Sequence, residues 1–258
     1  MKRMLGWFLT AVLAVAVAGC GADSRNVRPT ASSDDNGQSA AQINTQLGIA
    51  YLQEGRKDLA LQQLNKALQQ NPDLPDAHNA LGVVYEQLGE IKEAEQHYRR
   101  AIELDPKDSS AQNNYGQLLC RAGRYEEAER HFLDAAKNPL YKRAAMAYTN
   151  AALCLPGNAP PAKAERYLNA ALASNPLYPA ALIEMATLKH NQGHNKEALK
   201  FLERYKAAAG VSPAMLLLGV KIQRALGDTV GEMHYASLLN SRYPNSPQVT
   251  ELQKLNSQ

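Results

Sequence analysis

The sequence lacks an excess of either charge. It holds 28 Lys and Arg against 25 Asp and Glu among 258 residues, which gives a formal net charge of +3 at pH 7. Without Lys2 and Arg3 at its start, 26 basic side chains (28 less these two) remain against the 25 acidic ones. Proteins that bind nucleic acid or an anionic membrane surface through their charge carry a clear basic excess. We therefore expect no nucleic-acid partner.

No apolar run is long enough to span a bilayer. The longest run, at residues 4–19, has about sixteen residues, whereas a membrane-spanning helix needs roughly twenty. It follows Lys2 and Arg3 and ends in small residues, and these three parts are typical of a bacterial secretory signal peptide. The start of the chain is therefore predicted to direct export across a membrane.

The apolar run ends in the letters VAGC, at residues 17–20. This ending resembles the lipobox of bacterial lipoproteins, with Val17 in place of the usual leucine. The resemblance implies a signal peptide of residues 1–19, cleavage before Cys20, a diacylglycerol on its thiol and an acyl chain on the new amine. The alternative is an ordinary signal peptide followed by a chance cysteine. Apart from this covalent lipid, no cofactor is expected.

Large apolar side chains are nearly absent from the segment after Cys20. Residues 20–40 are small and polar, so they cannot bury enough surface to fold and are predicted to form a flexible lipidated tether. Gly21 and Ala22 follow the cysteine, with no aspartate directly after it. By resemblance to the sorting rules of proteobacterial lipoproteins, this favours the periplasmic face of the outer membrane over retention at the inner membrane.

Motifs that carry chemistry are also missing. The sequence has no G-x-S-x-G motif and no phosphate-binding glycine loop. Of the six histidines only His190 and His194 have a spacing that suits a metal, and Gly193 is predicted to end the helix between them. We therefore expect neither a metal site nor an enzyme.

A 34-residue repeat is what the sequence does contain. Leu47–Gly48, Leu81–Gly82 and Tyr115–Gly116 follow one another at this step. Three further sets of residues keep the same step: Gly55, Gly89 and Gly123; Ala60, Ala94 and Ala128; Leu64, Tyr98 and Phe132. The pattern matches the tetratricopeptide repeat, a helix–turn–helix unit of 34 residues. Later copies are less regular, and the fourth has a long proline-rich turn, LPGNAPPAKAE.

The repeat predicts an all-α fold, a right-handed superhelix of six tetratricopeptide units with about thirteen helices. The predicted units are residues 41–74, 75–108, 109–144, 145–178, 179–212 and 213–246. Residues 247–258 are predicted to form a helix that caps the last exposed face.

In such a solenoid the first helices of the units line a concave groove. Carried over from the repeat family, the groove-facing positions are Thr45, Ile49, Leu52, Asn79, Val83, Glu86, Asn113, Gln117 and Arg121. Three of them (Ile49, Leu52 and Val83) are apolar, which favours docking of an amphipathic helix or an extended peptide. The alternative is that they pack against a neighbouring helix or the tether. A two-carboxylate clamp is absent, because Thr45 and Ile49 stand where it needs lysine and asparagine.

Only two cysteines, Cys120 and Cys154, remain after Cys20. They fall late in the first helices of the third and fourth units, and adjacent helices lie about 8–10 Å apart. A disulfide between them is therefore compatible with the geometry and with an oxidising periplasm. The alternative is two separate buried thiols.

The lipobox, the tether, the six repeats, the cysteine pair and the segment YTNAALC together resemble one family. It comprises the type IV pilus biogenesis lipoproteins of Gram-negative bacteria, the pilotins of the PilF or PilW type. The resemblance implies an adaptor, expected to be monomeric, that binds the pilus secretin subunit. It would bring the secretin to the outer membrane and promote its multimer assembly, as pilus biogenesis and twitching motility require. The alternatives are a scaffold for another envelope machine, serving outer-membrane proteins or cell-wall synthesis, and a recognition subunit of an enzyme.

Overall fold

The protein is described here by a computed structural model that covers residues 33–257. These residues form thirteen α-helices joined by turns and loops, and they contain no strand, so the predicted all-α class is confirmed. The helices are α1 (Ser33–Gln53), α2 (Lys57–Gln70), α3 (Pro75–Leu88), α4 (Ile91–Leu104), α5 (Ser109–Arg121), α6 (Tyr125–Lys137), α7 (Ala144–Leu153), α8 (Pro161–Ser174), α9 (Pro179–Asn191), α10 (Asn195–Ala209), α11 (Pro213–Leu226), α12 (Thr229–Arg242) and α13 (Pro247–Asn256).

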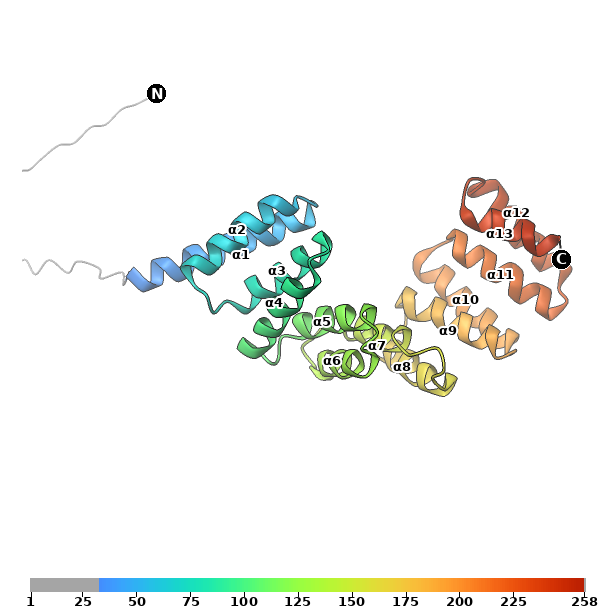
Figure 1. The fold of residues 1–258 in the computed structure, drawn as a ribbon. Coiled ribbons are helices and arrows are strands. Elements are labelled where there is room, and N and C mark those ends of the chain that lie inside the picture. Colours follow the sequence, from blue (N-terminus) through green and yellow to red (C-terminus); the bar gives the residue numbers. More distant parts are fainter. Residues whose placement is uncertain (1–32, 258) are drawn as a thin grey trace, which may run out of the picture.

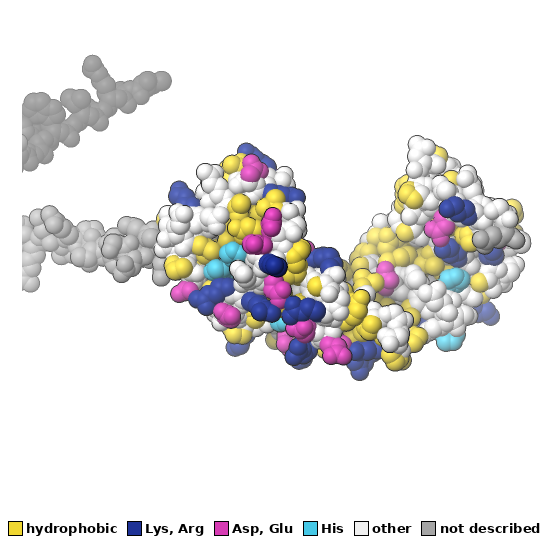
Figure 2. Space-filling view, viewed as in Figure 1, with side chains coloured by type: hydrophobic (Ala, Val, Ile, Leu, Met, Phe, Trp, Pro, Cys, Tyr) yellow, Lys and Arg dark blue, Asp and Glu magenta, His cyan; other side chains and the backbone are white. Residues whose placement is uncertain are grey.

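The helices pair in the order in which they follow one another along the chain. α1 packs on α2 and α3 on α4, and the same holds for each later pair up to α11 and α12, on which α13 packs. Figure 1 shows these pairs along a curved path, with α1 and α13 at opposite ends. Figure 2, seen from the same direction, shows the hollow inside the curve, with hydrophobic side chains on the wall that α9 to α11 form. This is the predicted solenoid of helix pairs.

Prolines and glycines mark many of the helix ends. Five helices (α3, α8, α9, α11 and α13) begin with a proline, whose missing N–H would have no partner in a first turn. At the other end, α3 stops at Gly89, whose φ of 84° is left-handed and favours glycine. The Gly89 N–H donates to the carbonyls of Glu86 and Tyr85, so helix ends recur where the repeat predicts them.

A close contact inside each of several pairs determines how the two helices cross. A Cβ placed on Gly82 of α3 would lie 2.5 Å from the ring of Tyr98 of α4, and one on Gly116 would lie 2.8 Å from the ring of Phe132. Both rings are almost fully buried, at 1% exposure. The repeated glycine therefore lets a large side chain of the second helix press directly against the backbone of the first.

The predicted boundary of the tether is wrong at its end. Residues 33–40 were expected to be flexible, but α1 begins at Ser33. Extending an existing helix costs far less than starting one, so a helix held by packing further on continues into a polar segment. The signal peptide, Cys20 and residues 21–32 lie outside the described residues. None of the helices α1 to α13 combines the length and the hydropathy that a bilayer crossing requires.

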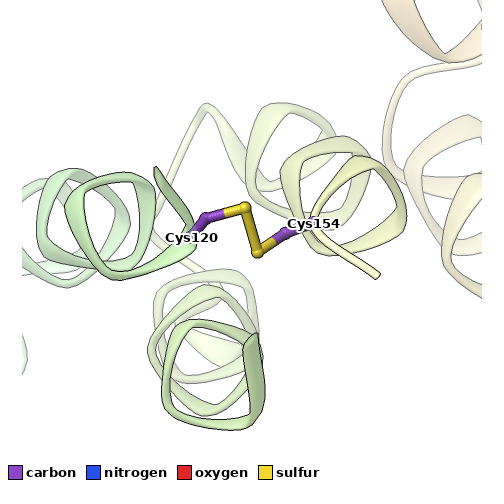
Figure 3. The surroundings of a disulfide bond; sticks show 2 residues. All are labelled: Cys120 and Cys154. Atoms are coloured by element: carbon purple, nitrogen blue, oxygen red, sulfur yellow. A yellow bond between two sulfur atoms is a disulfide. The ribbon is translucent and has the colours of Figure 1, made fainter. Parts of the chain in front are cut away.

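A disulfide links the third and fourth pairs. Cys120 in the last turn of α5 is bonded to Cys154, which follows α7, with an S–S distance of 2.16 Å and a Cα–Cα distance of 5.7 Å (Figure 3). Apart from this link, α5 and α7 approach each other less than α1 and α3 or α3 and α5 do. The proline-rich loop that separates α7 from α8 lies directly after Cys154. The bond therefore braces the place where neighbouring first helices pack least.

The glycine contact generates a first prediction. Gly82→Ala should lower the free energy of unfolding by up to about 2 kcal/mol, because overpacking of the added methyl group against Tyr98 costs about 1–3 kcal/mol and alanine regains roughly 1 kcal/mol in helix propensity. Urea unfolding followed by circular dichroism measures it. Gly157→Ala is the control, since a Cβ there meets no atom within 4 Å. A Gly82→Ala variant at least as stable as the wild type would contradict the packing.

The disulfide generates a second prediction. The double variant Cys120→Ser/Cys154→Ser should be less stable than the oxidised wild type by about 2–4 kcal/mol, because it loses the cross-link that restricts the unfolded chain. Unfolding with and without a reducing agent supplies the control. The reductant should bring the wild type down to the level of the variant and leave the variant unchanged. Equal stability of the oxidised and reduced wild type would contradict a bracing role.

Candidate functional site

Three adjoining cavities follow one another along the first helices α1, α3 and α5. Their volumes are about 490, 340 and 140 Å³. Ile49 lines the first and the second, and Val83 lines the second and the third, so the three form one continuous depression. We call it the N-terminal groove. A further cavity of about 140 Å³, lined by both bridged cysteines, shares Gln117 and Arg121 with the third. These cavities thus follow one another from Gln42 of α1 to the disulfide.

Apolar side chains form part of the wall of the groove. Ile49, Leu52 and Val83 all line the middle cavity, and all three are partly exposed. At the same time each packs against buried residues of the core. One side of each side chain therefore contacts the core, and the other faces the cavity.

An ion pair lines the third cavity. Glu86 of α3 accepts a hydrogen bond from the Tyr98 hydroxyl at 3.0 Å and forms a salt bridge with Arg121 of α5. Burial raises the pKa of Tyr98, and the charge of Glu86 raises it further, so the tyrosine stays a neutral donor. Glu86 and Arg121 are thus already paired with each other, and they tie neighbouring first helices together.

Asparagines link neighbouring first helices, and one of them corrects the sequence prediction. The amide of Asn114 donates to the Asn79 side-chain oxygen at 3.0 Å, and Asn150 of α7 donates in the same way to Asn113, also at 3.0 Å. Asn79 lines the middle cavity, but Asn113 is fully buried and lines no part of the groove. The prediction that Asn113 faces the groove is wrong, because the next unit covers it; Asn114 lines the groove at this point.

Thr45 and Gln117 are two further residues predicted to face the groove, and they differ in exposure. Thr45 borders the first cavity but is 5% exposed, and its hydroxyl donates to the carbonyl of Ala41 at 2.9 Å within α1. Gln117 is partly exposed and lines the third cavity. A partner in the groove therefore has more access to Gln117 than to Thr45.

The repeat pattern does not predict the polar residues of the middle cavity. Asp76 comes from the first turn of α3, Asp108 precedes α5, and Tyr141 and Arg143 come from the segment before α7. The repeat pattern contains no signal for them, because they meet only where the starts of the three helices α3, α5 and α7 come together. In the sequence, the one sign of an irregularity there is the segment LYKR at positions 140–143, where the chain between the third and fourth units is longer than the 34-residue step.

The described residues contain no group of three His, Cys, Asp or Glu side chains that could hold a metal ion. His190 lies near the end of α9, and its Nδ1 contacts the Asn195 side-chain oxygen at 2.7 Å. His194 precedes α10, on the other side of the turn at Gly193. The two histidines therefore sit on different elements, as the turn predicted by Gly193 requires.

Comparison with known proteins connects the repeats to a biological system. Sequence models described as tetratricopeptide repeat match residues 45–109, 97–130 and 161–220. Over 245 residues the chain is 32% identical to the type IV pilus assembly protein PilF of Pseudomonas aeruginosa, a match that covers 95% of this chain and 96% of that relative.

Solved structures agree with this relationship. The structure of Pseudomonas aeruginosa PilF superposes with a TM-score of 0.76 at 32% identity, and covers 85% of this chain and 99% of that one. PilW, described as a widely conserved type IV pilus biogenesis factor, gives 0.74 at 28% identity, with 83% and 98% covered. YrrB, a TPR protein with an unusual peptide-binding site, gives 0.56 at 17% identity over 74% and 97%, which is a likeness in fold alone. The chain therefore belongs to the PilF family of type IV pilus biogenesis proteins, built from tetratricopeptide repeats.

Proposed function

We propose that this protein is an outer-membrane lipoprotein adaptor, a pilotin, for the secretin subunit of the type IV pilus. It binds this subunit in the N-terminal groove, brings it to the outer membrane and promotes its assembly into the multimer through which the pilus emerges. Family membership over nearly the whole chain supports the link to the pilus. The observation that carries the binding role is the continuous groove with apolar side chains exposed along it.

The proposed mechanism is binding without covalent chemistry. The wall residues are held in place by the Glu86–Arg121 ion pair, the Asn79–Asn114 hydrogen bond and the disulfide before any partner arrives. A preorganised surface loses little conformational entropy on binding, so more of the contact energy is available for affinity. An amphipathic helix or an extended segment of the secretin would place its apolar side chains against Ile49, Leu52 and Val83.

The lipid on Cys20 would anchor the protein in the outer membrane. A single acyl chain holds a protein at a membrane only weakly and reversibly, whereas two or more chains anchor it stably. A diacylglycerol on the thiol together with an acylated amine meets that requirement. The repeats would then hold the secretin at the periplasmic face of the outer membrane.

A scaffold for another envelope assembly machine is the second candidate. It would use the same fold and the same groove for a different client. The two candidates differ in what deletion of the protein does: loss of heat-stable secretin multimers and of twitching motility supports the pilotin, and unchanged secretin multimers support the other scaffold.

The variant Val83→Asp tests whether the groove binds the secretin subunit. The variant should bind the purified secretin subunit at least about tenfold more weakly, because it places a charge on the apolar wall that the partner desolvates. Val230→Asp is the matched control, since Val230 is 72% exposed on α12 and lies outside the groove. Thermal unfolding must show that both variants are folded. If Val83→Asp bound the secretin subunit as tightly as the wild type does, the groove would not be the binding site.

The variant Cys20→Ala tests whether the lipid localises the protein to the outer membrane. This variant should leave the outer-membrane fraction and appear as soluble protein in the periplasm or as uncleaved precursor, with the helical repeats still folded. Membrane fractionation and circular dichroism measure the two properties. Ser24→Ala, in the same segment, should stay in the outer membrane. A Cys20→Ala protein that remains in the outer-membrane fraction would refute lipid-based targeting.

A further inference from the structure

Three charged side chains line the middle cavity of the N-terminal groove. Asp76 and Asp108 line it, with Arg143 on the segment before α7. In the described part of the chain none of these three forms a salt bridge, in contrast to Glu86 and Arg121 in the next cavity. Two carboxylates against one guanidinium leave this part of the groove with an excess of negative charge.

One oxygen of the Asp108 carboxylate has a structural role, and the other has no hydrogen-bond partner in the described residues. Its Oδ1 caps α5 by accepting the N–H groups of Ser110 and Ala111 at 2.8 and 3.1 Å. Its Oδ2 is buried and has no hydrogen-bond partner within residues 33–257. Burial raises the pKa of Asp108, the two backbone N–H groups lower it, and the neighbouring charge of Asp76 raises it. The capped charge thus has neither a counter-ion nor full access to water, which is costly.

The same cavity has an apolar side. Ile49, Leu52 and Val83 line it together with the two aspartates, and its volume is about 340 Å³. A wall that is apolar at one part and acidic at another suits a long side chain with a hydrocarbon stem and a cationic end, as in lysine and arginine. A purely apolar side chain would leave the carboxylates without a counter-ion, and an acidic one would be repelled.

From this arrangement we infer that the segment bound in the groove presents a lysine or arginine to the middle cavity, with its stem along Ile49 and Leu52 and its charge beside Asp76 and Asp108. Asp76 is exposed and can contact the cation directly. Asp108 acts mainly through its field, which is weakly screened because its Oδ2 is buried. The inference rests on the proposed function and adds the chemistry by which the partner is recognised. The bound segment has apolar residues next to a lysine or an arginine.

The test measures the affinity of the mature lipidated protein for the purified secretin subunit at low and high salt. Asp108→Asn removes the charge and keeps a good N-cap, and Asp76→Asn removes the other charge. Each should weaken binding by about fivefold or more and reduce the loss of affinity that added salt causes in the wild type.

Two other aspartates give matched controls. Asp228 caps α12 by accepting the N–H of Gly231 at 3.0 Å, and Asp58 lies in the first turn of α2; neither lines the groove. Asp228→Asn and Asp58→Asn should bind the secretin subunit as the wild type does. A loss of binding in these controls equal to that in the groove variants would overturn the inference, since the effect would then follow from the overall charge.

The remaining outcomes separate the inference from the proposed function. If both groove aspartate variants bind like the wild type while Val83→Asp does not bind, the partner docks through apolar contacts alone and the inference is wrong. If Val83→Asp also binds normally, the groove itself is not the secretin site. If Arg25→Ala/Arg28→Ala tightens secretin binding and Asp108→Asn abolishes that gain, the base in the cavity comes from this chain's own N-terminal segment, which overturns the partner assignment.

Discussion

The contact between a glycine of one helix and a large side chain of the next is the constraint on which the rest of the structure depends. It brings Gly48 against Leu64, Gly82 against Tyr98, Gly116 against Phe132 and Gly219 against Tyr235. Because the same crossing recurs, the first helices of successive pairs fall on the same side of the solenoid and can line one groove. Any larger residue at these glycines would separate the two helices and change the direction of every unit that follows.

The same contact connects the core to the groove. Tyr98 packs its ring on Gly82 and reaches Glu86 with its hydroxyl, and Glu86 in turn pairs with Arg121 of the next unit. One side chain therefore takes part in the packing of its own pair, in the link between pairs and in the wall of the third cavity. The position of the groove residues follows from core packing more than from the loops between helices.

How much of this could be predicted from the sequence depends on the range of the interaction. The glycines, alanines and large residues at the 34-residue step act within one pair, so the helices and their pairing could be predicted from local spacing. Asn113 could not be placed, because its burial depends on α7 in the following unit. Asp76, Asp108 and Tyr141 meet only where the starts of α3, α5 and α7 come together, and no position of the repeat predicts that contact. The start of α1 was missed for a different reason, since composition alone does not show how far a packed helix extends into polar residues.

Site-specific photo-crosslinking in living cells can show whether the N-terminal groove holds the secretin, as we propose. A photoreactive amino acid would replace Gln53, an exposed residue that lines the middle cavity, and in a second strain Met233, which is 64% exposed on α12. If the groove binds the secretin, position 53 should crosslink to the secretin subunit and position 233 should not. A secretin crosslink from position 233 without one from position 53 would contradict this proposal.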